Sequence, residues 1–483
     1  MMSFSRRNLL QSTLAAPWIS LAQNKTGKTN VLMFAIDDLN THIGCWGDPL
    51  VKTPNIDRLA GHGVRFERAY CNYPLCNPSR TVLLSGRRPE ITRIHDNTQP
   101  ARTYLGDDAV FLPEYFEAHG YFTARVGKVA HFENQVHWDI SVNDMPEQLP
   151  DDLRRQVMMR QKRGQEAMMR KGPDGKILPQ PLTGGIGGMP WRATDNPDEK
   201  ESDGATARHI VQLIDDHKDE PFFIACGFRK PHTPLFAPRK YFDMYRLEDI
   251  HLPNTPADDR DDIPPLALIC TNKDNLHSDE ERKQVTLAYY ACTTFMDAQL
   301  GLVLDAMDRH KLWDNTVVIL WADHGWHLYD HLQLWGKITQ FEESAHVPLI
   351  IHAPGKLAGA SSRRLVEWID IYPTLTELCG LPRKSDNDGT SLVPLLSDPK
   401  RAWKKAAYTM NWRGGDRYGR GLCTDRYRYT EWSDGRDGTE LYDRHTDPHE
   451  WTNLAGKAKT ADIQQELREL LRHGQKTNVP PRG

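Results

Sequence analysis

Short apolar segments constrain the fold of this chain more than any other feature. Residues 30–36, 221–228 and 316–322 are runs dominated by Val, Ile, Leu, Phe and Ala, and each ends in polar residues. Runs of this length without polar alternation are typical of strands buried on both faces. Between such runs lie patterns of helical period, at residues 111–119, 205–216 and 283–310. The sequence therefore predicts an α/β fold with a large mixed, mainly parallel sheet sandwiched by helices.

The character of the sequence changes twice along the chain. Residues 142–204 are rich in Arg, Met, Gly and Pro, which indicates an insertion with one candidate helix at residues 151–170. After residue 381, short runs rich in Tyr, Arg, Gly and Asp predict a smaller C-terminal antiparallel sheet and a final helix at residues 461–473. We therefore expect a main domain over residues 30–380 and a C-terminal subdomain over residues 381–483.

Composition excludes several classes of function. The chain has 483 residues, a formal net charge of −4 and a pI near 6.6, so no global charge favours nucleic acid or an acidic membrane surface. Eight cysteines are too few and too scattered for a fold framed by disulfides. No apolar run after the N-terminal region approaches about 18 residues, so we do not expect an integral membrane protein.

The first 22 residues resemble an export signal. Arg6 and Arg7 precede a mildly apolar run that ends at the small residues around Ala22. Paired arginines in this position are typical of twin-arginine signals, which predicts export to the periplasm or the extracellular space. A non-specific, frayed helix is the alternative interpretation.

Carboxylates follow two of the predicted strands. Asp37 and Asp38 come directly after the first, and Asp323 and His324 after the run at 316–322. Open α/β sheets place ligand-binding groups at the carboxyl ends of their strands. Carboxylate oxygens suit Ca²⁺ or Mg²⁺. The sequence therefore predicts a metal site, although a solvated turn is the alternative for an isolated Asp pair.

A polar pentapeptide, CNPSR at residues 76–80, lies between a strand-like run (64–70) and a helical one (81–85). Pro78 fixes its own φ, and Ser79 is a good helix cap. The thiol of Cys76 is thus expected just ahead of a helix N-terminus, where backbone N–H groups favour an anion. A buried core cysteine is the alternative.

The pentapeptide resembles the C-x-P-S-R core of the formylglycine-dependent, cysteine-type sulfatases. Other blocks resemble the same family in the same order: residues 30–38, 53–66, 127–131, 230–234 and 322–327. KPHTP at 230–234 and DHGW at 323–326, followed by HVPLI, are most similar to the iduronate-2-sulfatase branch. The resemblance covers about residues 30–455. It implies an alkaline-phosphatase-like fold.

The resemblance also implies the cofactors. Cys76 would be oxidised to formylglycine (3-oxoalanine) by a formylglycine-generating or other sulfatase-maturating enzyme. Ca²⁺, or Mg²⁺ in its place, would be held by residue 76 and by Asp37, Asp38, Asp323 and His324. His324 departs from the Asn that many sulfatases carry there, although it matches the iduronate-2-sulfatase-like pattern.

The catalytic roles follow from the same resemblance. The hydrated aldehyde at residue 76 would attack sulfur while Asp323 accepts its proton, and Arg80 would steady it. Lys128 and Lys337 would hold the sulfate oxygens. His232 would protonate the leaving sugar oxygen, and His131 would take the proton of the second hydroxyl so that sulfate is expelled.

The function predicted is hydrolysis of sulfate monoesters on a sulfated sugar or polysaccharide, with a uronic acid 2-sulfate as one candidate. A phosphate or phosphonate monoester hydrolase of the same fold and a non-catalytic binder of sulfated glycans are the alternatives. His95 and Asn97 are candidate substrate-binding residues, together with Arg88, Arg93 and Asp96. A solvated basic loop is the other interpretation of this segment.

Overall fold

A computed structural model describes residues 27–143, 191–271, 278–476 and 478–480. The predicted export signal at 1–22 and the predicted helix at 151–170 lie outside these ranges. None of the helices formed by the described residues combines the length and the apolar character needed to cross a membrane.

An eight-stranded sheet forms the centre of the molecule, in the order β13-β2-β12-β9-β1-β7-β4-β5. The central strand β1 (Asn30–Ile36) pairs in parallel with β7 (Phe222–Phe228) and with β9 (Thr316–Ala322), and every residue of all three is buried. β4 (Phe122–Gly127) adds in parallel to β7. β12 (Leu349–His352) runs antiparallel to both of its neighbours, β9 and β2. The predicted mixed, mainly parallel sheet is confirmed.

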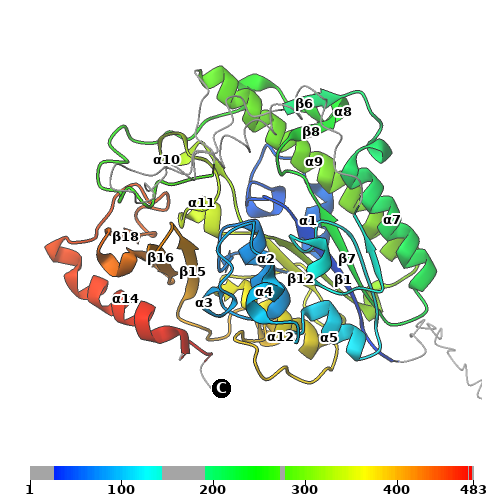
Figure 1. Ribbon diagram of the computed structural model, residues 1–483. Helices are drawn as coiled ribbons and strands as arrows, with labels where there is room; N and C mark the ends of the chain where they lie inside the picture. Colours follow the sequence, from blue (N-terminus) through cyan, green and yellow to red (C-terminus); the bar gives the residue numbers. More distant parts are fainter. Residues whose placement is uncertain (1–26, 144–190, 272–277, 477, 481–483) are drawn as a thin grey trace, which may run out of the picture.

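Helices cover both faces of this sheet. Figure 1 shows α7 (Ser202–His217) and α9 (Asp279–Arg309) on one side and α5 (Leu112–Ala118) and α12 (Ile371–Leu378) on the other. The long helix α9 begins with a capping box, in which the Ser278 hydroxyl accepts a hydrogen bond from the backbone N–H of Glu281 at 3.2 Å. The apolar residues of the sheet, of α5, α7 and α12 and of the C-terminal half of α9 form one continuous core, while the N-terminal half of α9 packs in a second cluster.

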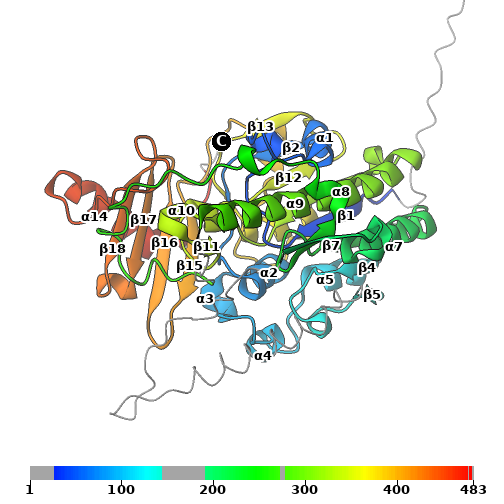
Figure 2. The same ribbon diagram turned by 90° about the horizontal axis from the view of Figure 1, so that it is seen from above.

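The C-terminal part of the chain forms a separate antiparallel sheet, seen in orange at one end of the molecule (Figure 2). Its strands are β15 (Ala407–Trp412), β16 (Tyr418–Cys423), β17 (Tyr427–Trp432) and β18 (Thr439–Asp443). Helix α14 (Ala461–His473) packs on it through Leu467 and Leu471. This confirms the predicted C-terminal sheet and helix, while the domain boundaries remain a prediction.

The strand predicted over residues 64–70 is wrong as a single element. β2 (Val64–Phe66) belongs to the large sheet, whereas β3 (Ala69–Tyr70) pairs with β14 (Val366–Glu367). A turn at residues 67–68 separates them. β3 therefore leaves the large sheet and leads the chain toward Cys76.

Candidate active site

Four neighbouring parallel strands, β9, β1, β7 and β4, deliver polar residues to one edge of the sheet. Asp37 and Asp38 follow β1, and Asp323 follows β9. Lys128 follows β4, and the loop after β7 carries His232. Because the carboxyl ends of parallel strands meet at the same edge, residues almost 300 positions apart in the chain become neighbours.

The backbone at Asp38 has a left-handed conformation, with φ of 62°. Asp tolerates this region better than most residues, and such strain clusters at functional sites. Two contacts hold the turn: Asp38 N–H donates to Asp323 Oδ1 at 3.1 Å, and the Tyr289 hydroxyl donates to the Asp38 carbonyl at 2.7 Å. The hydroxyl of Tyr289, on α9, also accepts from Asn40 N–H at 3.0 Å. Helix α9 therefore fixes the conformation of the acidic turn.

Helix α2 (Cys76–Ser85) begins at Cys76 itself, which corrects the helix predicted from residue 81. Ser79 is not its cap, because its hydroxyl donates to the Asp323 carbonyl instead. The Asn77 N–H of the first turn donates to Asn97 Oδ1 at 3.0 Å, so a distant loop supplies the cap. Pro78 is tolerated in the first turn, where a backbone donor would lack a helical partner.

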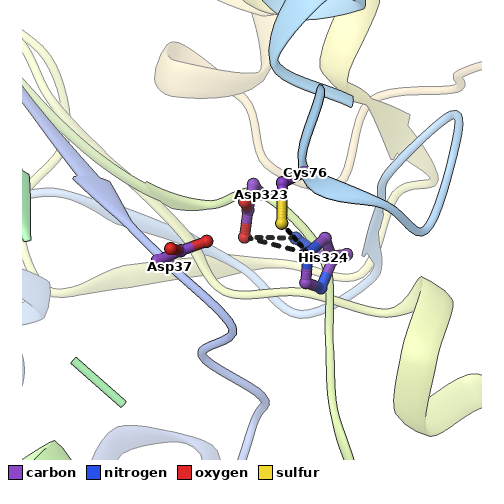
Figure 3. Close-up of side chains that lie close together, drawn as sticks. All are labelled: Asp37, Cys76, Asp323 and His324. Carbon is purple, nitrogen blue, oxygen red and sulfur yellow. Dashed lines mark hydrogen bonds and ion pairs between the residues drawn. The ribbon is translucent and has the colours of Figure 1, made fainter. Parts of the chain in front are cut away.

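Cys76 is fully buried, yet its surroundings are polar. Its Sγ lies 3.3 Å from His324 Nε2 and 3.0 Å from Lys337 Nζ. Figure 3 shows the thiol beside His324 and Asp323, with Asp37 facing them from β1. Burial raises the pKa of the Cys76 thiol to about 12, although Lys128 and Lys337 act in the opposite direction. The unmodified thiol is therefore neutral at physiological pH and a poor nucleophile.

Arg80 connects the separate strand ends. Its Nε donates to Asp323 Oδ2 at 2.9 Å, and its Nη2 donates to Asp37 Oδ1 at 3.2 Å. Its Nη1 donates to the carbonyls of Lys128 and Val129, at 2.5 and 3.0 Å. One buried guanidinium thus satisfies groups from β1, β9 and β4, a task that suits the fixed fork of an arginine better than a lysine.

Two lysines neutralise the remaining carboxylate charge. Lys337 Nζ donates to Asp38 Oδ1 at 2.6 Å, and Lys128 Nζ pairs with Asp37. Burial would raise the pKa of Asp37, but the neighbouring Lys128 and Arg80 hold it well below its usual value. Burial raises the pKa of Asp38 despite Lys337. Two lysines and an arginine therefore face three carboxylates in a buried site, where charge interactions are strong.

Hydrogen bonds determine which histidine nitrogens face the site. His324 Nδ1 contacts its neighbour's carbonyl, Gly325 O, at 3.0 Å, which leaves Nε2 toward Asp38 Oδ1 at 3.3 Å. His232 Nδ1 contacts Thr233 O at 2.5 Å, and its Nε2 lies 3.8 Å from Asp38 Oδ2. A backbone carbonyl on Nδ1 fixes the tautomer and frees Nε2 to act as a ligand or to exchange protons.

The pKa values of the site histidines are all shifted downward. Burial, the largest cause, lowers the pKa of His232 and of His131 to about 3 and also lowers that of His324. Lys128 and Arg80 lower that of His131 further. All three rings are therefore neutral in the free protein at physiological pH.

Two overlapping groups of side chains have the composition of a metal site. In each, the candidate ligand atoms lie within 4.8 Å of one another; the groups are Asp37, Cys76, Asp323 and His324, and Asp37, Asp38, Cys76 and His232. Asp38 Oδ2 is buried and accepts no hydrogen bond in the described part of the chain. A carboxylate-rich set with one such oxygen fits a hard divalent cation.

Comparison with known proteins identifies the family. The model of the family described as "Sulfatase" matches residues 29–381, and a second, described as "N-sulphoglucosamine sulphohydrolase, C-terminal", matches residues 324–477. The chain belongs to the sulfatase family. It is therefore a sulfuric ester hydrolase, and it has the fold of the formylglycine-dependent sulfatases.

Individual relatives agree with this assignment. The sulfatase is 34% identical to a sulfatase of Formosa agariphila over 93% of this chain and 87% of the relative. It is 31% identical to human iduronate 2-sulfatase over 74% of this chain and 70% of the relative. The crystal structure of a phosphonate monoester hydrolase from Agrobacterium radiobacter is similar with a TM-score of 0.74 and 24% identity, covering 93% and 96% of the two chains, which shows the shared fold.

Most of the site residues predicted for this sulfatase lie together. Direct contacts or electrostatic interactions link Asp37, Asp38, Cys76, Arg80, Lys128, His131, His232, Asp323, His324 and Lys337. The candidate substrate-binding residues lie at the edge of this group: the Asn97 oxygen binds the first turn of α2, and the His95 ring packs beside Trp412 at 5.7 Å.

Sequence reasoning missed the residues that support the sulfatase site from outside. Tyr289 lies in the middle of a long apolar helix, where a buried aromatic residue is usually core. Asn40 also donates from its side chain to the Trp326 carbonyl at 3.0 Å, joining the β1 loop to the β9 loop. Neither residue stands in a motif, and their partners are at least 249 positions away, so no local signal indicates them.

Proposed function

We propose that this sulfatase hydrolyses sulfate monoesters of a sulfated sugar or polysaccharide, through formylglycine made from Cys76 and a bound divalent cation. The observation that carries the proposal is the cluster around residue 76, in which carboxylates, His324 and Lys337 surround one buried side chain. Ca²⁺ is the expected ion, with Mg²⁺ as the alternative, because the donors are mainly carboxylate oxygens. A uronic acid 2-sulfate is one candidate substrate.

Charge favours binding of an anionic ester. Arg80, Lys128 and Lys337 balance Asp37, Asp38 and Asp323 in number. A divalent cation held by Asp37, Asp38, Asp323, His324 and residue 76 would leave the site with net positive charge. The two lysine ammonium groups would then hold the non-bridging sulfate oxygens, and in a dry pocket such preorganised charges stabilise the transition state strongly.

When present, the oxidised residue 76 and the cation supply a hydrated aldehyde as nucleophile and a Lewis acid for the sulfate group. The Asp323 carboxylate, which belongs to the same cluster as residue 76 and which Arg80 orients through Oδ2, would accept the proton of the attacking hydroxyl. The His131 ring is neutral because burial, and then the charge of Lys128, lower its pKa to about 3. It would take a second proton during release of sulfate.

His232 would transfer a proton to the leaving sugar oxygen from Nε2. Its ring is neutral in the free protein because burial lowers the pKa to about 3. A bound sulfate ester places negative charge near Nε2, which raises the pKa of the ring and allows it to take up the proton that it donates. The Thr233 carbonyl on Nδ1 keeps Nε2 directed at the site.

Sulfate release tests the proposal. The protein is produced together with a sulfatase-maturating enzyme and incubated with a panel of sulfated oligosaccharides, an aryl phosphate and a phosphonate monoester, while free sulfate and phosphate are measured by ion chromatography. We expect sulfate release from at least one oligosaccharide and none with Cys76→Ala. Faster phosphate or phosphonate turnover would favour the related hydrolase activity, and binding without turnover by the matured protein would favour a glycan binder.

The maturating enzyme and the cellular location are further parts of the proposal. Conversion of Cys76 requires an enzyme that recognises the segment around CNPSR before or during folding, because the thiol is fully buried in the folded protein. Export to the periplasm or the extracellular space rests on the twin-arginine-like residues 1–22. A fusion of these residues to a reporter, assayed in a strain without twin-arginine transport, tests the export signal.

A further inference from the structure

Three aromatic rings at the edge of the active site belong to no hydrophobic cluster of the described residues. Trp412 and Tyr418 are cross-strand partners at the end of the β15–β16 hairpin. The His95 ring lies 5.7 Å from the Trp412 ring and 5.5 Å from the Tyr418 ring. All three side chains are partly exposed, whereas Tyr408 and Tyr429 of the same sheet are buried against α14. The core of the subdomain therefore does not account for these rings.

Hydrogen bonds fix the base of this hairpin next to the active site. The Ile338 carbonyl accepts from Asn411 Nδ2 at 2.7 Å, and the Ile338 N–H donates to the Pro74 carbonyl at 3.0 Å. Ile338 directly follows Lys337, and Pro74 comes two residues before Cys76. The end of β15 is thus attached to the two segments that carry the reacting side chain and one of its lysines.

A second set of contacts attaches the rings to the start of α2. The Trp412 N–H donates to the Tyr73 hydroxyl at 2.9 Å, and that hydroxyl donates to the His95 carbonyl at 2.8 Å. Two residues after His95, Asn97 binds the first turn of α2 through Asn77 N–H. Figures 1 and 2 both show β15 beside α3 (Pro89–Thr92), which leads into this loop.

We propose that His95, Trp412 and Tyr418 form a subsite for the sugar ring next to the sulfated one in an oligosaccharide substrate. This inference rests on the proposed function and narrows it to substrates that carry a second sugar beside the sulfated one. The C–H faces of a pyranose ring are apolar and pack on aromatic rings, with specificity set by nearby polar groups.

Positive charge around the rings suits this ligand. Arg417 stands in the hairpin turn beside the aromatic surface, and the Arg420 guanidinium, which also pairs with Asp434 at 2.6 Å, lies over the Tyr418 ring at 5.3 Å. A sulfated polymer is a polyanion, whereas the whole chain carries a net charge of −4, so local cations must attract it.

The test compares a long and a short substrate. Trp412→Ala and Tyr418→Ala are assayed on a sulfated oligosaccharide that the unaltered enzyme desulfates and on 4-nitrophenyl sulfate, which has no neighbouring sugar. We expect kcat/KM on the oligosaccharide to fall about tenfold, mainly through KM, as loss of about 1.4 kcal/mol of binding implies. The loss on 4-nitrophenyl sulfate should be at least fivefold smaller. Trp412→Phe should restore most of the oligosaccharide activity.

Trp451 provides a matched control in the same subdomain. Its ring stacks on His449 at 4.6 Å. Trp451→Ala should change kcat/KM on the two substrates by the same factor. Equal losses on both substrates for Trp412→Ala, or no loss on either, would overturn the subsite.

Binding measurements keep this inference distinct from the proposed function. In a Cys76→Ala background, calorimetry with sulfated oligosaccharides should show that Trp412→Ala weakens binding about tenfold, with unchanged thermal unfolding of the protein. Failure of the matured, unaltered enzyme to release sulfate would contradict the proposed function even if this binding difference is found. Unchanged binding on Trp412→Ala, with normal sulfate release by the unaltered enzyme, would contradict the subsite alone.

Discussion

The guanidinium of Arg80 donates to the carboxylate of Asp323 at 2.9 Å, and both side chains are buried almost completely. This pair joins the first helix turn after Cys76 to the end of β9. Since the same guanidinium also reaches Asp37 and two carbonyls beyond β4, it couples the positions of the reacting residue and the acidic side chains.

Replacing Arg80 should therefore affect stability and activity together. Arg80→Lys keeps the charge but loses the fork, so we expect sulfate release to fall at least about 100-fold and the free energy of unfolding to fall by about 3 kcal/mol, because buried carboxylate and carbonyl groups lose their hydrogen bonds. Arg87→Lys is the control, because Arg87 pairs with Asp386 and Asp388 near the surface and should change stability by less than about 1 kcal/mol. Denaturant unfolding and kinetics measure both effects; equal behaviour of the two variants would contradict the role of Arg80.

Chelation should destabilise the enzyme as well as inactivate it. A ligand that binds only the folded state at 100 times its Kd adds about 2.7 kcal/mol of stability, which EDTA treatment should remove. Asp38→Asn should abolish this EDTA-dependent change in Tm. The Tm measured after Ca²⁺ or Mg²⁺ is added back shows which of the two ions stabilises the enzyme more. An EDTA-insensitive Tm and undiminished activity would rule out the divalent ion.

Gly227 tests the alignment of the strand ends. A Cβ at Gly227 would lie 2.3 to 2.5 Å from backbone atoms of Lys128, so Gly227→Ala must displace the lysine that faces Asp37. We expect a loss of about 2 kcal/mol or more of stability and a marked fall in kcat/KM. Gly61→Ala, where a Cβ meets no atom within 4 Å, should leave both nearly unchanged. Normal kinetics of Gly227→Ala would show that the Lys128 position is not critical.

A buried histidine outside the site should make stability depend on pH. Burial opposes protonation of His331, but its hydrogen bond with Asp259 at 3.2 Å and the nearby Glu343 and Asp330 raise its pKa to about 9. Since the folded-state pKa lies above the unfolded value, the stabilisation is fully present below about pH 6.5 and is lost as pH rises through about 9.

The corresponding experiment compares the unaltered protein with His331→Gln by thermal unfolding between pH 6 and 10. The variant should be less stable by up to about 3 kcal/mol at pH 6. The difference should shrink as the pH approaches 10. A difference that stays constant over this range would show that His331 contributes by packing and not through its charge.

The sequence predicted the large sheet and the edge at which polar residues gather, because both depend on local information. Continuous apolar runs specify β1 and β9, and the position of Asp37 and Asp323 after them follows from the direction of parallel strands. The final helix at 461–473 has the predicted bounds, because the polar residues around α14 mark its ends.

The parts that the sequence did not predict depend on contacts between distant segments. Helix α2 starts at Cys76 because Asn97 caps it from another loop, which no local cap residue indicates. Tyr289 supports Asp38 from the far side of the site across 251 positions. The link between β15 and the residue after Lys337 likewise arises only when the C-terminal sheet packs against the main domain.

The oxidation state of residue 76 is the most direct test of the whole account. Tryptic cleavage after Arg68 and Arg80 yields a peptide of residues 69–80, which contains Cys71 as an internal, unmodified reference. Preparations matured to different extents are analysed by mass spectrometry for the aldehyde at residue 76 and assayed for sulfate release. We predict activity proportional to the converted fraction, with no activity at zero conversion. Activity that is independent of this fraction would contradict the account.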